Sequence, residues 1–118
     1  MVPAGAYLRR ADRLRSPRDF RRVNVQGVRG VSANFVVLTA PRRGPGDTPR
    51  LGITVTRRVG NSVVRNRVKR RVREAFRHQR RELRGPADVV VIARKGAVNL
   101  ASVEVESELT ALFRSCSR

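Results

Sequence analysis

A run of cations between positions 65 and 77 is the part of this sequence whose spacing best suits ligand binding. On a helix these cations fall on the two sides of an apolar stripe, with Arg65, Lys69, Arg73 and Arg77 on one side and Arg67, Arg70 and Arg71 on the other. Like charges four residues apart repel by roughly a few tenths of a kcal/mol per pair, and only Glu74 interrupts the run. Phosphate groups would neutralise that repulsion, and the Asn66 amide can hydrogen-bond a base edge or a ribose hydroxyl. The segment therefore predicts a nucleic-acid-binding surface.

The other residues that could do chemistry do not form a catalytic pattern. Two-metal hydrolysis of a phosphodiester needs several carboxylates that converge on one site. None of the nine acids falls in a motif of known metal spacing: Asp12, Asp19, Asp47, Glu74, Glu82, Asp88, Glu104, Glu106 and Glu108. His78, the single histidine, is expected to be a solvated residue of the basic helix, and Cys116, the single cysteine, a bystander. We therefore predict no catalytic residue and no metal site in the polypeptide alone.

Composition sets the class of protein and of partner. The chain has 118 residues, 27 basic and 9 acidic, for a net charge of +18, and 40% of its residues are hydrophobic. Residues 51–84 hold 12 basic and 2 acidic residues, whereas residues 85–118 hold 4 of each. Such concentration indicates a polyanionic partner. A single cysteine excludes a disulfide scaffold, and the absence of a long apolar run favours a cytoplasmic protein. Of the basic residues 25 are Arg, which suits bidentate phosphate contacts or reflects genomic base composition.

The elements that would position these residues follow from periodicity. Ser16 and Pro17 predict a helix that ends at Gly27, and apolar runs predict strands over 34–40, 51–56 and 88–93, the last buried on both faces. The basic helix would start after Asn61 or Ser62 and stop at Gly85-Pro86, and apolar residues 105–113 predict a last helix. The order is α-β-β-α-β-α, an α+β sandwich in one domain. Gly27 to Gly30 matches the Gly-x-x-Gly loop of one RNA-binding module, which we attribute to chance.

The segment from Arg57 to Glu74, RRVGNSVVRNRVKRRVRE, resembles the signature of the bacterial ribonuclease P protein subunit. Further segments fall in that family's order and spacing, namely Arg13-Leu14, Asp19-Phe20, Phe35–Val37, Leu51–Val55 and Asp88–Arg94. The resemblance spans roughly residues 9–114. It implies a single-domain sandwich with a small, mainly antiparallel sheet and a left-handed βαβ crossover, similar to the second domain of ribosomal protein S5. We expect one RNA-binding domain over 1–118, with residues 1–8 and 115–118 loose.

The resemblance also implies a function. Proteins of this family bind a large catalytic RNA that, with Mg²⁺, removes the 5′ leader of precursor tRNA. The chain would thus be the accessory subunit of an endoribonuclease whose catalytic groups and Mg²⁺ belong mainly to RNA, and it needs no further protein partner. Residues implied to bind the RNA subunit are Arg57, Arg58, Asn61, Arg65, Asn66, Arg67, Lys69, Arg70 and Arg73. Residues implied to form a cleft for the leader are Phe20, Phe35, Leu38, Lys69 and Arg73.

The chain departs from the family pattern at a few positions. Asn24 replaces a second aromatic residue that often follows Phe20, and Leu38 replaces a tyrosine found in some members. Both losses weaken the case for base stacking in the cleft, and Phe35 remains either a cleft or a core residue. Ser62 stands where Ala is usual, and Arg57-Arg58 replace Lys-Lys. These changes keep size and charge.

Three other functions compete with this hypothesis. A structural ribosomal protein would share the size, the charge and even the fold, and a general nucleic-acid-binding or DNA-packaging protein would share the charge. Neither accounts for the ordered motif with its flanking strands. A stand-alone metal-dependent nuclease is opposed by the inventory of carboxylates.

Overall fold

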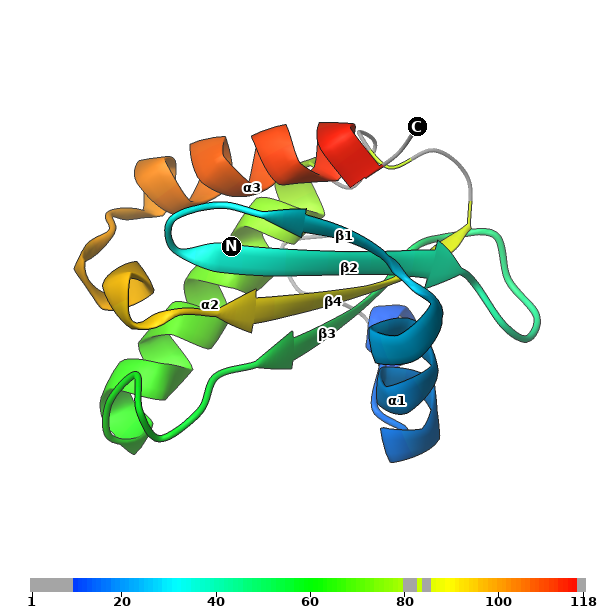
Figure 1. The fold of residues 1–118 in the computed structure, drawn as a ribbon, viewed down its shortest axis with the longest axis horizontal. Coiled ribbons are helices and arrows are strands. Elements are labelled where there is room, and N and C mark those ends of the chain that lie inside the picture. Colours follow the sequence, from blue (N-terminus) through cyan, green and yellow to red (C-terminus); the bar gives the residue numbers. More distant parts are fainter. Residues whose placement is uncertain (1–9, 80–82, 84–85, 117–118) are drawn as a thin grey trace, which may run out of the picture.

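The computed structural model describes residues 10–79, 83 and 86–116. These residues form a mixed sheet between layers of helix (Figure 1). In chain order the elements are the 3₁₀ turn η1 (Arg10–Asp12), α1 (Pro17–Gln26), β1 (Val28–Val31), β2 (Phe35–Pro41), β3 (Arg50–Thr54), α2 (Ser62–Gln79), β4 (Ala87–Ala93), the 3₁₀ turn η3 (Lys95–Asn99) and α3 (Ser102–Cys116). None of the helices in this part of the chain is long and apolar enough to cross a membrane.

The strands lie in the order β1-β2-β4-β3. β1 pairs with β2 and β2 pairs with β4, both antiparallel, whereas β3 and β4 are parallel. β4 is therefore central, and Val89, Val90 and Val91 have no exposed surface. This confirms the prediction of a strand buried on both faces, since a continuous apolar run suits a strand that helices cover on each side.

The connection between β3 and β4 has the unusual hand that the family resemblance implies. In Figure 1 both strands point to the left, β4 lies above β3, and α2 passes behind the sheet. A path with this order is a left-handed βαβ crossover, against the strong general preference for the right-handed form. The left-handed path places the basic helix on the sheet face opposite α1.

The two faces of the sheet have separate apolar clusters. α2 and α3 cover one face, where Val72, Phe76, Leu109 and Phe113 are fully or almost fully buried against β2, β3 and β4. Phe76 and Phe113 meet edge to face, with ring centroids 6.1 Å apart. α1 covers part of the other face, where Val23 packs with alternate residues of β2 and β4 in a smaller cluster. No helix of the described residues covers the rest of that second face, and we call it the open face.

The fourth strand, β1, was missed by the sequence analysis. It is an edge strand of four residues with Arg29 and Gly30 in its interior, so it shows no alternation of apolar and polar residues. Gly30 is buried against α3, where a Cβ atom would lie 2.8 Å from Sγ of Cys116. The Gly-x-x-Gly sequence thus ends within a strand instead of forming a loop between helices.

The predicted boundaries agree with the structure at most ends. The basic helix was predicted to stop at residues 85–86, and residue 85 lies outside the described residues. Residues 1–8, 117 and 118, which were predicted to be loose, also lie outside them. The prediction that residues 115–118 are loose is wrong for the first two of them, because α3 continues to Cys116. Burial among apolar neighbours raises the pKa of the Cys116 thiol, which fits an inert core residue.

A buried carboxylate fixes α1 to the sheet. Asp88, at the start of β4, has no exposed surface and accepts hydrogen bonds at 2.7 and 2.8 Å from Nε and Nη2 of Arg50 on β3. Arg22 of α1 donates to the same carboxylate, as does the backbone N–H of Arg43 at 3.3 Å. Burial alone would raise the pKa of Asp88, but the hydrogen bonds from Arg50, Arg22 and Arg43 hold it below its ordinary value. This cluster sets the position of α1 beside the open face.

Candidate nucleic-acid interface

The basic helix α2 begins at a side-chain cap. Asn61 Oδ1 accepts a hydrogen bond from the backbone N–H of Val64 at 3.0 Å, so Asn61, and not Ser62, caps the helix. Val68, Val72 and Phe76 form the buried stripe that the periodicity predicts. Because this stripe faces the sheet and α3, the cations on either side of it are directed away from the core.

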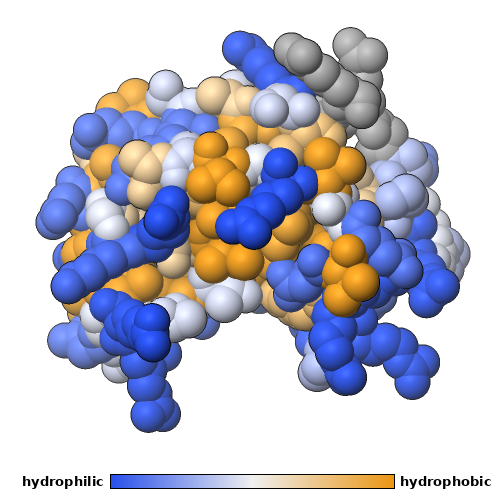
Figure 2. All heavy atoms as spheres, viewed as in Figure 1, coloured by the Kyte–Doolittle hydropathy of each residue, from blue (hydrophilic) through white to orange (hydrophobic). Residues whose placement is uncertain are grey.

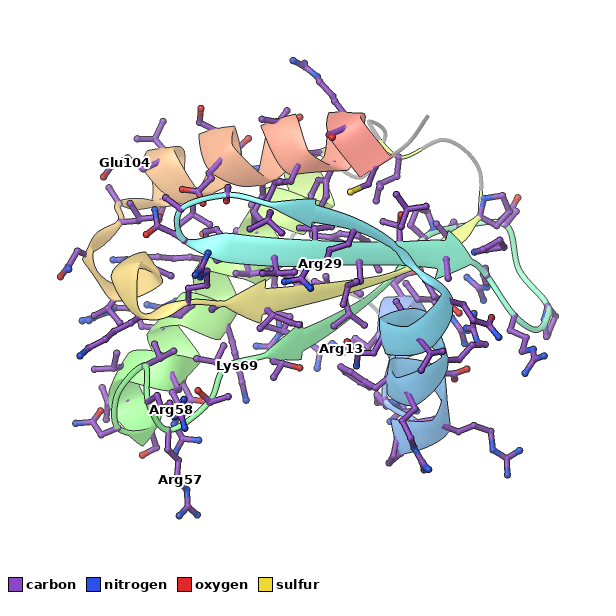
Figure 3. The ribbon with its side chains drawn as sticks, viewed as in Figure 1. Arg13, Arg29, Arg57, Arg58, Lys69 and Glu104 are labelled. Carbon is purple, nitrogen blue, oxygen red and sulfur yellow. The ribbon has the colours of Figure 1, made fainter. Side chains whose placement is uncertain are left out.

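The residues predicted to contact an RNA subunit all remain accessible at the surface. Arg57, Arg58, Asn61, Asn66 and Arg70 are exposed, and the other four are partly exposed: Arg65, Arg67, Lys69 and Arg73. Arg57 and Arg58 lie on the loop before α2, which extends from the molecule on the side away from α1 (Figure 3). The buried side chain of Val59 anchors that loop. The fold therefore gathers the loop and the first turns of α2 into one cationic surface.

Two arginines approach each other across the outer edge of the sheet. Burial, and then the charge of Arg13, lowers the pKa of Arg73 below its ordinary value. Arg13 precedes α1, and its backbone forms a bridge to Leu51 of β3. Figure 3 shows Arg13 beside α1 and Lys69 toward the other end of β3. Two neighbouring cations of this kind are stabilised by a shared anion. Sequence reasoning missed Arg13, because only the bridge to β3 brings it near α2.

Not every cation of α2 belongs to this surface. Arg71 donates from Nη1 to the backbone carbonyl of Leu100 at 2.6 Å, which turns its guanidinium toward η3. Helical spacing alone predicts that Arg71 lies with Arg67 and Arg70. At the far end of the helix, His78 lies 3.4 Å from Glu106 of α3 and is half exposed. Arg71 and His78 thus serve contacts within the fold.

A pocket of about 500 Å³ lies on the open face, beside the C-terminal turn of α1. Its apolar floor is made by Val36, Leu38 and Ile92, and its polar rim includes two cations: the lining residues are Asn24, Gly27, Arg29, Val36, Leu38, Ile92 and Arg94. Figure 2 shows hydrophobic residues in the middle of this face, with hydrophilic side chains lying across them. Other hydrophilic side chains extend from the molecule on both sides of this area. We call this hollow the open-face pocket. An apolar floor with cations at the rim suits a base and its phosphate.

The structure separates the residues predicted to form a cleft. Leu38 lines the open-face pocket. Phe35 is on the opposite face of β2, fully buried in the core with α2 and α3, so the prediction that it lines a cleft is wrong. Lys69 and Arg73 lie on α2, across β3 from the pocket, and are not among its lining residues. Arg29 and Arg94, which do line it, were missed. Arg29 lies on the unpredicted strand β1, and Arg94, which follows β4, is brought to the pocket by contacts with Ser32 and Asn34 of the β1–β2 turn.

Phe20 packs beside the open-face pocket, against a glycine. Its ring lies on Gly52 of β3, where a Cβ atom would be 2.8 Å from Cε1 of Phe20 and closer still to Cζ. The ring is partly exposed and belongs to the apolar cluster under α1. Gly52 is therefore required because the aromatic ring approaches the strand closely.

We expect Gly52→Ala to lower the free energy of unfolding by about 1–3 kcal/mol, because the added methyl group overlaps the ring of Phe20. Urea unfolding of both single variants and of the Phe20→Ala/Gly52→Ala double variant measures the coupling. The methyl group should be tolerated much better when the ring is absent. An equal loss in both backgrounds would show that the ring is not the cause.

The polar groups of the described residues are mainly cations and hydrogen-bonded carboxylates. No three His, Cys, Asp or Glu side chains among them lie close enough to hold a metal ion. Asp88 is held by two arginines, and Glu108 accepts hydrogen bonds from Ser32 and from Asn34 at the β1–β2 turn. What the arrangement can do is bind polyanions on α2 and bind an apolar, phosphate-bearing group in the open-face pocket.

Comparison with known proteins places these features in context. The family model described as Ribonuclease P matches residues 8–117. A ribonuclease P protein component from Shouchella clausii is 41% identical over 102 residues, which cover 86% of this chain and 83% of that protein. Another from Syntrophobacter fumaroxidans is 43% identical over 105 residues, which cover 86% of this chain and 85% of that protein.

Solved structures show the same similarity. The RNase P protein of Staphylococcus aureus superposes with a TM-score of 0.81 at 30% identity, over 92% of this chain and 100% of that one. The RNase P protein of Thermotoga maritima superposes with a TM-score of 0.76 at 36% identity, over 87% of this chain and 96% of that one. The fold, including its mixed four-stranded sheet, is thus the one those proteins have.

Proposed function

The chain belongs to the ribonuclease P protein family, and we propose that it binds the catalytic RNA of that enzyme and the 5′ leader of precursor tRNA in the cytoplasm. Family membership implies a subunit of a tRNA 5′-processing endoribonuclease. The observation that carries the finer proposal is the accessible cationic surface formed by the loop before α2 and its first turns.

The cationic surface of α2 binds the RNA subunit. Arg57, Arg58 and Arg70 are exposed, and a guanidinium can donate two parallel hydrogen bonds to one phosphate. Asn66, between cations, donates to or accepts from a base edge or a ribose hydroxyl. Binding there offsets the repulsion between the phosphates of the catalytic RNA and those of the substrate, which strengthens substrate binding.

The open-face pocket holds the leader. Its apolar floor accepts a base without regard to sequence, and Arg29 and Arg94 at the rim pair with phosphates or stack on the base through their planar guanidiniums. Asn24 lines the pocket with an amide that can hydrogen-bond a base edge. In this chain guanidinium stacking thus replaces part of the aromatic stacking, since Phe20 packs beside the pocket and does not line it. Lys69, Arg73 and Arg13 extend the cationic path along the outer edge of β3.

Catalytic groups and Mg²⁺ belong to the RNA in this proposal. The described residues of the protein provide no cluster of three metal-ligating side chains, so the phosphates of the RNA are the ligands that would hold the ion. Mg²⁺ supplies charge stabilisation for the hydrolysis of the phosphodiester. The protein contributes binding energy and orientation.

We expect the protein to make the holoenzyme prefer precursor tRNA to mature tRNA, and Arg29→Ala/Arg94→Ala to reduce that preference about tenfold or more. Holoenzyme is reconstituted once with the unaltered protein and once with Arg29→Ala/Arg94→Ala. Equilibrium binding of both RNAs to each holoenzyme gives the ratio of the affinity for precursor tRNA to the affinity for mature tRNA. Lys95→Ala/Arg114→Ala removes two charges from η3 and α3 and serves as the control. A ribosomal or general RNA-binding protein would bind both RNAs equally, which would contradict the proposal.

A further inference from the structure

A second hollow lies on α1 and has no role in the function proposed above. It has a volume of about 480 Å³ and is lined by Arg18, Arg21, Arg22, Val25, Gln26 and Arg43. We call it the α1 basin. Five of its residues come from α1 and one from the loop between β2 and β3. It shares no lining residue with the open-face pocket.

Of the four cations that line the α1 basin, one is neutralised by carboxylates and three are not. Arg22 is bound to Asp88 and Asp19. The backbone of Arg43 is fixed at both its polar atoms, because its N–H donates to Asp88 and its carbonyl accepts from Arg50 at 2.9 Å. The side chains of Arg18, Arg21 and Arg43 are exposed, and no carboxylate in the described part of the chain lies within salt-bridge distance of them. Three uncompensated guanidiniums therefore surround one hollow, on a rigid base.

The α1 basin also has groups that suit a nucleotide beyond its phosphate. Val25 is 82% exposed, so its apolar surface lies open beside the arginines that line the basin. An exposed apolar side chain among guanidiniums fits the ribose and base faces of a single strand, whose bases are free to leave the stack. The amide of Gln26 is available for a hydrogen bond to a ribose hydroxyl or a base edge.

The position of the α1 basin connects it to the open-face pocket. Asn24 lines the pocket, whereas the next two residues, Val25 and Gln26, line the basin. The C-terminal turn of α1 is thus the wall that separates the two hollows, and a helix with its side chains is only about 10 Å across. A strand that leaves the pocket over this turn meets the basin directly.

We propose that the α1 basin binds the sugar-phosphate backbone of the 5′ leader upstream of the nucleotides held in the open-face pocket. This inference rests on the proposed function, since it assigns the basin to the same strand. Its consequence is that long leaders are bound more tightly than short ones, through contacts independent of sequence. The extra affinity decreases with salt, because it comes from phosphate neutralisation.

The test uses the Arg18→Ala/Arg43→Ala protein, which leaves the structural Arg22 unchanged. Holoenzyme is reconstituted with a bacterial ribonuclease P RNA, and its affinity is measured for precursors with leaders of about 4 and about 12 nucleotides, the range of single-strand sites on one small domain. We expect about tenfold weaker binding of the long leader, unchanged binding of the short leader, and a salt slope lower by about 1.4 for the long leader. The control variant is Lys95→Ala/Arg114→Ala, which should change neither affinity.

Other outcomes overturn the inference in distinguishable ways. An equal loss of affinity for precursors with short and with long leaders would show that Arg18 and Arg43 act on the nucleotides held in the open-face pocket and not on those upstream. A loss in affinity for the RNA subunit alone, without precursor, would assign the basin to the catalytic RNA. Unchanged binding of the long leader would leave the basin without this ligand. If the unaltered protein fails to favour precursor over mature tRNA, the proposed function itself fails, which is a separate result.

Discussion

The Asp88→Asn protein should lose about 3–5 kcal/mol of its free energy of unfolding, because the substitution leaves two partly buried arginines without their carboxylate. Arg50 donates to both oxygens of Asp88 and Arg22 donates to one. An asparagine offers one oxygen and turns N–H donors toward a guanidinium. Urea unfolding followed by circular dichroism measures the loss.

Asp47→Asn is the matched control for this prediction. It removes the same charge from an exposed position of the β2–β3 loop, so we expect a change within about 0.5 kcal/mol. If Asp88→Asn proved as harmless as Asp47→Asn, the cluster would not be what fixes α1 to the sheet.

The effect of Asp88 also depends on pH in a defined direction. Its pKa is lower in the folded protein than in the unfolded chain. A group of this kind contributes its full stabilisation above the unfolded-state pKa and loses it as the pH falls through the folded-state pKa. The difference in stability between the unaltered protein and Asp88→Asn should therefore be full at neutral pH and shrink in acid. A difference that grows in acid would contradict the lowered pKa.

The Arg67→Ala/Arg70→Ala protein should bind the RNA subunit roughly 10- to 100-fold more weakly at moderate salt, because two phosphate contacts are lost. The plot of log affinity against log salt should flatten by about two units, one for each contact. Arg70 is exposed and Arg67 partly exposed, three residues apart on the same helix. Filter binding or calorimetry over a range of salt concentrations gives the slope.

Arg71→Ala provides the control on the same helix. Its guanidinium donates to the carbonyl of Leu100, so its loss should lower stability and leave the salt slope almost unchanged. An unchanged slope in Arg67→Ala/Arg70→Ala, or an equal change in Arg71→Ala, would show that the phosphate contacts lie elsewhere.

Local patterns in the sequence predict the helices and the central strand, because those signals are carried by neighbouring residues. The capping residue, the apolar stripe and the apolar run of β4 each lie within one segment. The strand β1 could not be predicted in this way, since its glycine is explained only by the close approach of α3. The left-handed crossover came from the family resemblance alone, as the general rule favours the opposite hand.

The site was harder to predict because its residues meet only through tertiary structure. All six residues of β2 from Phe35 to Ala40 are buried, so alternation shows that Phe35 and Leu38 face opposite sides without showing which side is open. Asp88 lies 66 residues from Arg22 and 38 from Arg50, and nothing local links them. Helical spacing located the cations of α2 well, but it could not show that Arg71 donates a hydrogen bond to the carbonyl of Leu100.

Cleavage of precursor tRNA in a reconstituted system tests the central claim most directly. The protein is combined with a bacterial ribonuclease P RNA at a low Mg²⁺ concentration at which that RNA alone is nearly inactive, and release of the 5′ leader is followed with time. The account predicts strong stimulation of cleavage by the protein, reduced stimulation by Arg67→Ala/Arg70→Ala, and no cleavage by the protein without RNA. Failure to stimulate the RNA, or cleavage by the protein alone, would contradict it.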